Sequence, residues 1–397
     1  MHILLIHQAF TTLDEPGGTR HYELARGLAA AGHRVTVIAS PVSYLTGKTG
    51  SREPVSKEGV AILRAGAYSA LHRSFAHRVI AFFGFMVSSF WLGLRVREVD
   101  LVWGTSPPIF QGLTALVLAQ LKRVPFLFEV RDLWPAFAVA VGVLRSRTLI
   151  RMTEWLEGLL YRRADRVMVN SPGFVEHVRA RGARSVSLVP NGADPAMFDP
   201  DIDGSRFRAE HGLDGRFVAL YAGAHGLSND LDVVLEAAAL LADRPGLEIV
   251  LLGDGKEKGR LMGRAEAMGL KNLRFLPPVP KLGMREALAA ADACIAILKP
   301  VEAYRTVYPN KVFDYLAAGR PVVLAIEGVI REVVEAAGAG IPVPPGDPGA
   351  LAGALRELAA DPERSRWMGR AGRAYVEVHF DRARLVEELV RIVEEFK

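Results

Sequence analysis

The feature that most constrains this chain is a repeated alternation of short apolar runs with amphipathic helical patterns. Residues 2–6 and 35–38 read as apolar strands, and residues 21–31 between them carry apolar side chains at helical spacing before Gly32. Strands that are apolar on both faces are typical of parallel sheets covered by helices on each side. The chain is therefore predicted to have a doubly wound α/β fold.

The pattern indicates two such α/β series. With 397 residues the chain is longer than one ordinary core requires. The Pro- and Gly-rich stretch 191–214 interrupts the alternation and reads as a linker, and a second series begins with the strand at 217–222. We expect an N-terminal domain over 1–195 and a C-terminal domain over 196–380, with the helix at 381–397 packing back onto the first domain. Ligands bind such sheets at the carboxyl ends of the strands.

The net charge and the first residues of the chain limit which partners and which cellular location are expected for the protein. The formal charge of +5 suits an anionic partner but does not separate nucleic acid, a membrane surface and a phosphorylated small molecule. The chain opens on the apolar run His2–Ile6 without a basic leader, so a cytoplasmic location is expected.

The segment Pro309–Pro321 predicts a helix with an anion at its start. Asn310 is a suitable N-cap, and Gly319 is a suitable residue after the last turn. Lys311 places a cation at the positive end of the helix dipole, which costs about 0.3–1 kcal/mol unless an anion binds there. Asp314 lies on the same helical face, where it can accept hydrogen bonds from ribose hydroxyls. A solvated lysine at a frayed helix start is the alternative.

This segment resembles the family 4 retaining glycosyltransferases of the GT-B fold, above all the bacterial group that builds polysaccharides on lipid carriers. The likeness runs along nearly the whole chain in motifs of matching order and spacing, which are Gly17-Gly18, Gly32-His33, Ser106-Pro107-Pro108, Arg131-Asp132-Leu133-Trp134-Pro135, Pro190-Asn191-Gly192-Ala193-Asp194, Tyr221-Ala222-Gly223 and Gly253-Asp254-Gly255. The resemblance implies two Rossmann-like domains with a cleft between them. It also implies transfer of a hexosyl or N-acetylaminosugar unit from a UDP-linked donor, without a cofactor, to a polyprenyl-diphosphate-linked acceptor.

The resemblance also implies the site. The donor-binding residues would be Gly17, Gly18, Gly223, Gly253, Thr306, Val307, Tyr308, Asn310, Lys311 and Asp314. Lys311 would stabilise the departing diphosphate and is the first catalytic candidate. Arg131 and Asp132 are the other two, for which a structural ion pair at a strand end is the alternative. An ordinary tight turn is the alternative for Gly17-Gly18.

The chain departs from the family pattern at four positions. Asp314 and Thr306 stand where two Glu residues are usual, and Ala224 and Asn229 stand where an Arg and a Lys often hold the diphosphate. These departures shift the phosphate contacts onto Lys311 and its helix.

No metal ion is expected in the site. Of the two D-x-D matches, Asp199-Pro200-Asp201 suits a turn, and Asp230-Leu231-Asp232 suits the cap of a helix. The first loop lacks G-x-G-x-x-G, and the second strand ends without an acidic residue, which argues against a dinucleotide-dependent dehydrogenase.

The uncharged run Val79–Leu94 raises the question of a membrane. It is shorter than the roughly 20 residues that span a bilayer. Basic residues flank it at Arg64, Arg73, Arg78, Arg95 and Arg97. Residues 64–97 therefore suit contact with an anionic membrane surface, and a buried helix is the alternative. The resemblance, through its lipid-linked acceptor, implies peripheral association with the inner face of the membrane.

Two other functions remain open at this point. A nucleotide-sugar 2-epimerase shares the two-domain architecture, and a non-enzymatic peripheral membrane protein would explain the basic, apolar surface. Nucleic acid is not expected as a partner, because the aromatic run carries no interleaved charges.

Overall fold

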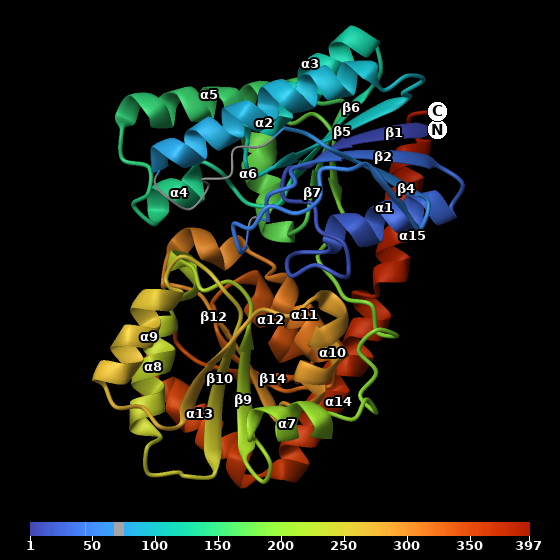
Figure 1. Cartoon of the computed structure of the whole chain (residues 1–397). Coiled ribbons are helices and arrows are strands. Elements are labelled where there is room, and N and C mark those ends of the chain that lie inside the picture. Colours follow the sequence, from blue (N-terminus) through green and yellow to red (C-terminus); the bar gives the residue numbers. More distant parts are fainter. Residues whose placement is uncertain (44, 67–74) are drawn as a thin grey trace. The chain divides into compact units, whose positions relative to one another are not determined.

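The computed structural model describes residues 1–43, 45–66 and 75–397. The chain forms two units, each with its own core (Figure 1). The first unit comprises Met1–Thr12, Gly17–Pro190 and Ala383–Lys397, and the second comprises Leu13–Pro16 and Asn191–Arg382.

The first unit is built on a sheet of order β3-β4-β2-β1-β5-β6-β7-β8, in which the β3–β4 pair is antiparallel and the other pairs are parallel. Its strands are β1 (His2–Ile6), β2 (Arg34–Ala39), β3 (Val55–Lys57), β4 (Val60–Arg64), β5 (Leu101–Ser106), β6 (Phe126–Val130), β7 (Arg166–Val169) and β8 (Val186–Leu188). Its helices are α1 (Arg20–Ala30), α2 (Phe75–Arg95), α3 (Phe110–Lys122), α4 (Ala136–Ala140), α5 (Arg147–Arg163), α6 (Val175–Ala180) and the returning α15 (Arg382–Glu394), with the short turn η1 (Pro172–Phe174).

The second unit has an all-parallel sheet of order β11-β10-β9-β12-β13-β14. Its strands are β9 (Phe217–Ala222), β10 (Leu247–Leu252), β11 (Leu273–Leu276), β12 (Ala293–Ile297), β13 (Val322–Ala325) and β14 (Gly340–Pro342). Its helices are α7 (Ser205–His211), α8 (Leu231–Leu240), α9 (Lys258–Ala267), α10 (Lys281–Ala289), α11 (Asn310–Ala317), α12 (Val329–Ala336), α13 (Pro348–Ala360) and α14 (Pro362–His379), with the short turns η2 (Leu227–Asn229) and η3 (Glu302–Thr306).

Strand β9 shows why most residues of these sheets are apolar. Val218, Leu220 and Ala222 lie in one buried cluster, which also contains the apolar face of α11. Ala219 and Tyr221, which alternate with them, lie in a second cluster together with residues of α8. Successive strand residues point to opposite faces, so helices on both sides require apolar residues at every position. The predicted doubly wound α/β class is confirmed.

In both sheets the winding direction reverses at one point. In the first sheet the reversal lies between β1 and β5, and in the second it lies between β9 and β12. Beyond the carboxyl ends of strands at such a point the loops diverge, and this is where open α/β sheets bind ligands. The topology therefore directs attention to the residues that follow β1 and β5 in one unit and β9 and β12 in the other.

The stretch 191–214 is not the free linker that the sequence suggested. It belongs to the second unit and contains α7. Phe198, Phe207 and Leu213 are buried in the core of that unit, so apolar residues spaced among the prolines and glycines anchor the segment. Turn-forming composition predicted irregular backbone but not its packing.

Helix α2 contains the uncharged run, and its two faces differ. Ala81, Phe85 and Ser89 are buried, whereas Phe83 and Trp91 are exposed. One apolar face thus packs into the unit, as the buried-helix alternative expects, and another meets solvent; contact with a membrane stays a prediction. Among the described residues, no helix has the length and apolar character needed to cross a bilayer.

The last helix, α15, contributes to the core of the first unit. Leu389 and Val393 are fully buried, and the contact with α1 is so close that Gly27 has no room for a side chain. An added Cβ at Gly27 would lie 2.3 Å from Val386 Cγ1.

We expect Gly27→Ala to lower the stability of the first unit by about 1–3 kcal/mol through overpacking against Val386, less the helix-propensity gain of about 0.5–1 kcal/mol. Thermal unfolding should show a fall of roughly 2–4 °C for each kcal/mol lost. The double variant Gly27→Ala/Val386→Ala should recover the stability that overpacking removes, because the clashing methyl groups are gone. Strict additivity of the two single changes would contradict the contact.

Candidate functional site

Helix α11 begins one residue earlier than its sequence suggested. Pro309 is the N-cap and Asn310 is the first helical residue, so the expected capping role of Asn310 is wrong. A proline with an extended backbone precedes helices readily. The Asn310 side chain instead lies over the first turn, with Nδ2 3.4 Å from Asp314 Oδ2. The helix ends as expected, with Gly319 in the left-handed conformation at φ 66°.

Lys311 lies in the first turn of α11, and its ammonium group is buried. Nζ has no hydrogen-bond partner among the described residues. It lies 3.9 Å from the centroid of the Tyr221 ring, at the carboxyl end of β9. A cation on a desolvated aromatic face gains about 2 kcal/mol, but an unpaired buried donor costs about 1–3 kcal/mol. Burial lowers the pKa of Lys311 to about 7. An anion bound at this point would satisfy the ammonium group and reverse the sign of both costs.

Two glycines form the wall beside Lys311. Gly223 follows β9 at φ 145°, and a Cβ there would lie 2.9 Å from Lys311 Nζ. Gly253 follows β10 at φ 150°, and a Cβ there would lie 1.9 Å from the Gly223 carbonyl oxygen. Both backbones therefore approach closely only because a side chain is absent. Gly223, Gly253 and Lys311, which the sequence predicted as parts of one site, are brought together in the second unit.

Asp314 lies one helical turn beyond Lys311 and is buried. Its Oδ2 accepts a hydrogen bond of 2.6 Å from Lys281 Nζ, at the start of α10. The carboxylate that the sequence predicted for a ribose is thus held in a buried ion pair.

In the segment before α11, residues 306–308, the side chains of Thr306 and Tyr308 are held by contacts within the unit, so this segment can offer a ligand mainly its backbone. Thr306 ends η3, where its hydroxyl donates to the Ala303 carbonyl oxygen at 2.7 Å. Val307 follows in an extended conformation. Tyr308 packs edge-on against Phe313, and its carbonyl oxygen accepts a hydrogen bond of 2.7 Å from Asn191.

His225 in the second unit has an unexpected environment. Its ring is fully buried, and neither ring nitrogen has a partner among the described residues. Burial, followed by the charges of Lys258 and Lys311, lowers the pKa of His225 to about 4. His225 is therefore a neutral imidazole beside the Lys311 site.

In the first unit, the predicted residues follow the strands near the reversal point. Gly17 and Gly18 lie in the loop between β1 and α1, where Gly17 has a φ of 150°. Arg131 and Asp132 follow β6, and Arg131 Nη2 donates to the Pro107 carbonyl oxygen at 2.6 Å. Burial, opposed by the charge of Arg131, raises the pKa of Asp132 to about 6.

Behind these residues lies a buried charge cluster that the sequence did not reveal. Glu129 Oε2 is 2.7 Å from His21 Nε2, and Glu129 Oε1 accepts a hydrogen bond of 3.1 Å from Arg20 Nε. Burial alone would raise the pKa of Glu129, but His21 and Arg20 outweigh it and lower that pKa to about 2. The His7 ring lies 4.0 Å from that of His21. An ionised carboxylate thus fixes α1 against the carboxyl end of β6.

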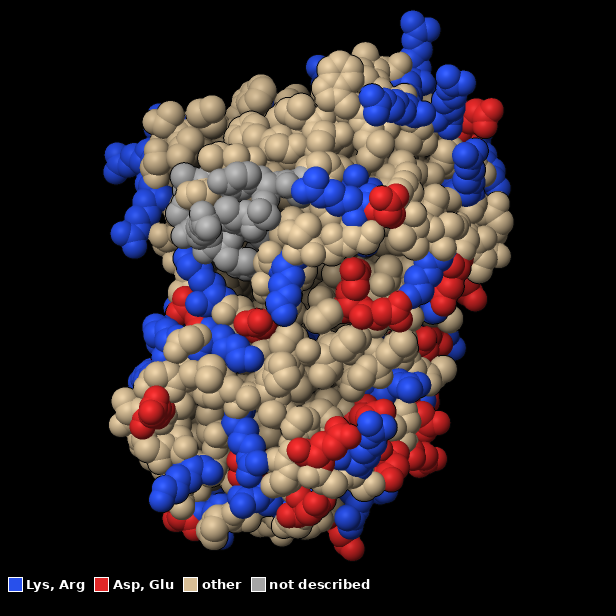
Figure 2. Space-filling model, in the orientation of Figure 1, with Lys and Arg blue, Asp and Glu red and all other residues tan. Residues whose placement is uncertain are grey.

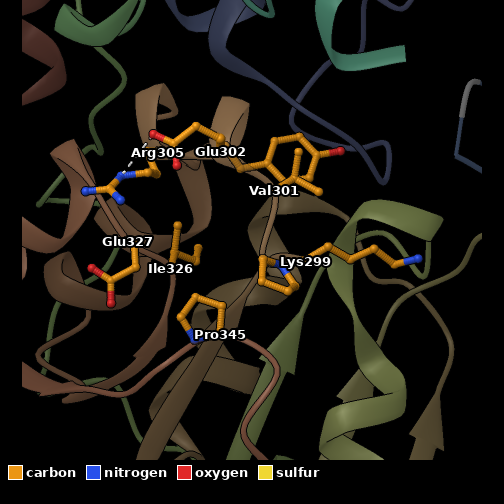
Figure 3. A pocket seen from close by; sticks show the side chains of 9 residues that line it. Lys299, Val301, Glu302, Arg305, Ile326, Glu327 and Pro345 are labelled. Carbon is orange, nitrogen blue, oxygen red and sulfur yellow. Dashed lines mark ion pairs between the residues drawn. The ribbon is translucent and has the colours of Figure 1, made fainter. Parts of the chain in front are cut away.

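A separate cavity of about 170 Å³ opens in the second unit beyond β12 and β13 (Figure 3). Its walls come from Lys299, Pro300, Val301, Glu302, Tyr304, Arg305, Ile326, Glu327 and Pro345. Figure 3 shows the ion pair between Arg305 and Glu302, with nitrogen and oxygen 3.6 Å apart. None of the predicted donor-binding residues lines this cavity, so it does not coincide with the Lys311 site.

Comparison with known families accounts for both units. Residues 17–192 match the family model described as "Glycosyl transferase 4-like domain", and residues 216–361 match that described as "Glycosyl transferases group 1". The chain is a family 4 glycosyltransferase.

Known proteins resemble the glycosyltransferase over most of its length. It is 27% identical over 321 residues to the putative colanic acid biosynthesis glycosyl transferase WcaI of Escherichia coli K12, covering 77% of this chain and 78% of that one. Sucrose-phosphate synthase from Thermosynechococcus elongatus has a TM-score of 0.80 at 20% identity, covering 99% of this chain and 98% of that one. Anabaena HepE in complex with UDP-glucose has a TM-score of 0.76 at 17% identity, with both chains fully covered. These likenesses confirm the GT-B fold.

Two site-adjacent residues of the glycosyltransferase were missed by sequence reasoning. Lys281 carried the signal that singled out Lys311, since it is also a cation in the first turn of a helix. His225 stands between residues with small side chains, Ala224 and Gly226, and this position alone carried no signal.

The acidic residues of the glycosyltransferase do not gather into a metal site. Among the residues described, no group of three or more His, Cys, Asp or Glu side chains is placed to hold a metal ion. Asp199 accepts from the Asp201 backbone N–H at 2.9 Å, as a turn requires. Asp230 occupies the N-cap position of α8, as predicted, but its side chain makes no capping hydrogen bond, and Asp232 pairs with Arg260 at 2.6 Å.

We expect Lys311→Met to stabilise the glycosyltransferase while impairing it. Methionine fills similar space over Tyr221 and leaves no buried donor unpaired, so stability should rise by about 1–3 kcal/mol near pH 7. The lysine pKa falls from 10.5 in the unfolded chain to about 7 when folded. The unfolded state therefore binds the extra proton between these values, and wild-type stability rises with pH across that window.

The advantage of the methionine variant should consequently be largest near pH 7 and should shrink toward about pH 10. Chemical denaturation at several pH values measures it. A variant less stable than the wild type at neutral pH would contradict the unsatisfied burial of Lys311.

Proposed function

We propose that this glycosyltransferase transfers a sugar, with retention of anomeric configuration, from a UDP-linked donor to a lipid-linked saccharide in cell-surface polysaccharide synthesis. The observation that carries the donor proposal is the buried ammonium of Lys311, which has no partner among the described residues and lies at the start of α11. WcaI is named for colanic acid biosynthesis, and the HepE structure contains UDP-glucose. Both names agree with the proposal.

The donor diphosphate would bind at the start of α11. Exposed N–H groups at a helix start and an adjacent ammonium group form a suitable phosphate site. As the sugar–phosphate bond breaks, negative charge grows on the leaving diphosphate, and Lys311 stabilises it. Gly223 and Gly253 allow the backbone to approach the phosphates, the backbone from Thr306 to Tyr308 borders them, and Asp314 binds the ribose.

The acceptor would bind at the carboxyl end of the first sheet. Arg131 is suited to an acceptor phosphate, since guanidinium groups bind phosphate oxygens in pairs. The pKa of Asp132 is raised to about 6, which is still below neutral pH, so the carboxylate is mostly ionised at pH 7. The raised pKa makes it a better proton acceptor than an ordinary aspartate. The loop of Gly17 and Gly18 follows β1 at the same edge of this sheet.

We expect Lys311→Met to reduce turnover of a UDP-sugar by at least about 100-fold, as removal of one preorganised charge-stabilising group does elsewhere. Lys271→Met is the matched control, because Lys271 is an exposed lysine of the same unit. Transfer of radiolabelled sugar into extracted lipid measures activity. Release of an isomerised free donor instead would identify a 2-epimerase.

Binding of UDP near pH 8 should take up a proton, to a maximum of about one per site, because the diphosphate raises the pKa of Lys311 from about 7. Calorimetry in Tris and in HEPES separates this uptake from the heat of binding. UDP itself is already ionised at this pH, so the protein supplies the signal. No uptake in the wild type, or equal uptake in Lys311→Met, would contradict the role of Lys311.

We also propose that the first unit binds an anionic membrane surface through α2, α3 and α5. Figure 1 shows these helices on one side of the first sheet, and both α2 and α5 pack against α3. Their exposed apolar side chains are Ile80, Phe83, Val87, Trp91, Leu121, Leu149, Met152 and Trp155. Apolar aromatic side chains beside cations suit the interface of a bilayer with acidic lipids.

The charges around these helices agree with such a surface. Residues Val60–Arg97 contain no acidic side chain, and neither does α3. The face in Figure 2 shows Lys and Arg side chains around a mostly uncharged surface of the first unit. Of the basic residues expected to flank the run, Arg73 lies outside the described residues, as does the side chain of Arg78.

We expect Trp91→Ser to weaken sedimentation of the protein with phosphatidylglycerol vesicles at least several-fold, because Trp91 is 60% exposed and gives up apolar area to the lipid. Trp367→Ser is the control, since Trp367 is 57% exposed on α14 of the second unit. Pure phosphatidylcholine vesicles should bind the wild type weakly. Equal binding by both variants would contradict the proposed surface.

A further inference from the structure

The ion pair between Lys281 and Asp314 joins the starts of two helices. Lys281 is the first residue of α10, and Asp314 lies in α11. Lys281 Nζ donates to Asp314 Oδ2 at 2.6 Å, and both residues are 9% exposed. The ammonium group also lies 4.9 Å from the centroid of the buried Phe198 ring. Lys281 is therefore held in one place by a carboxylate and an aromatic face.

Stability alone does not explain this pair. Removing two charges from water costs several kcal/mol each, and replacing a buried ion pair with apolar residues is often neutral or stabilising. Lys281 also stands at the positive end of the α10 dipole, which disfavours a cation. A buried charge in an unfavourable position is more often retained for a ligand than for the fold.

The hydrogen-bond capacity of Lys281 is only partly used. An ammonium group has three N–H donors, and one of them meets Asp314. Within the described part of the chain, the two other donors have no hydrogen-bond partner. A polar group beside the pair can therefore accept from Lys281 while it donates to Asp314.

Two neighbouring hydroxyl groups match this arrangement. Each hydroxyl of a vicinal diol can donate one hydrogen bond and accept others, so a carboxylate and an ammonium side by side bind both of its functions. Asp314 shares a helix with Lys311, three residues away on the same face. A ribose attached to a diphosphate at Lys311 would present its diol to this part of α11.

We propose that Lys281 is a second ribose-binding residue, which orients the Asp314 carboxylate and donates to a hydroxyl oxygen of the same diol. The inference rests on the proposed nucleotide-sugar donor. In this chain the shorter Asp314 stands where the family pattern has a Glu, and Lys281 fixes it toward the diol. The pair thereby makes the site selective for ribonucleotides over 2′-deoxyribonucleotides.

The test compares the affinities of UDP, ADP and GDP with those of their 2′-deoxy counterparts by calorimetry. The wild type should prefer the ribonucleotide by about 10- to 100-fold, the range for a hydrogen bond to a charged group. In Lys281→Met this preference should collapse to a few-fold, because the ribonucleotide binds less tightly while the deoxynucleotide changes little. Lys281→Arg should retain most of the preference, and Lys271→Met should retain all of it.

Removing one charge leaves its partner buried and unpaired, so Lys281→Met needs a check by thermal unfolding. The double variant Lys281→Met/Asp314→Leu removes both charges and should fold while having no ribose preference. An unchanged preference in either variant, or an equal loss of affinity for both sugars, would overturn the role of Lys281. If no diphosphate binds the wild type, it is the proposed donor function that fails.

Discussion

The central constraint on this structure is the buried ammonium group of Lys311, which has no hydrogen-bond partner among the residues described. Lys311 lies on the Tyr221 ring beneath Gly223, where desolvation lowers its pKa to about 7. A lysine in this position opposes both the helix dipole and the apolar core around it. Stability therefore disfavours the residue, and only the binding of an anion reverses the balance. Under the proposed function, the two glycines and the start of α11 bring the donor diphosphate to Nζ, at the edge of the sheet where the strand order reverses.

The buried groups beside α11 and those beside β6 differ in how they are satisfied. Beside α11, Lys311 Nζ and both ring nitrogens of His225 are buried without a hydrogen-bond partner in the part of the chain that the structure describes, which suits the proposed anion site. The first unit does the opposite around Glu129, whose carboxylate is held by Arg20 and His21. These contacts hold the start of α1 against the carboxyl end of β6. The accessible chemistry of that unit falls to Arg131 and Asp132, at the end of β6.

The sequence was sufficient for the fold because periodicity and topology depend on many residues at once. Apolar runs such as β9 specified parallel strands, and Lys311 broke a local rule strongly enough to mark the site. Side-chain partners depend instead on contacts between distant residues. Glu129 contacts His21, which is 108 residues away in the sequence, and Lys281 contacts Asp314, which is 33 residues away. Local sequence patterns therefore could not predict these pairs. The predicted start of α11 was wrong by one residue because Pro309 and Asn310 are both acceptable at a helix start, and local sequence does not decide between them.

The return of α15 to the first unit has a consequence for how the chain is made. Its buried residues Leu389 and Val393 complete a core whose other parts lie before residue 191. Domains generally fold as they leave the ribosome, at about 5–20 residues per second. Synthesis of residues 191–382 therefore separates the two parts of the first unit by roughly 10–40 s. During that interval the α1 surface around Gly27 is uncovered. The core of the first unit is therefore completed only when residues 383–397 have been made.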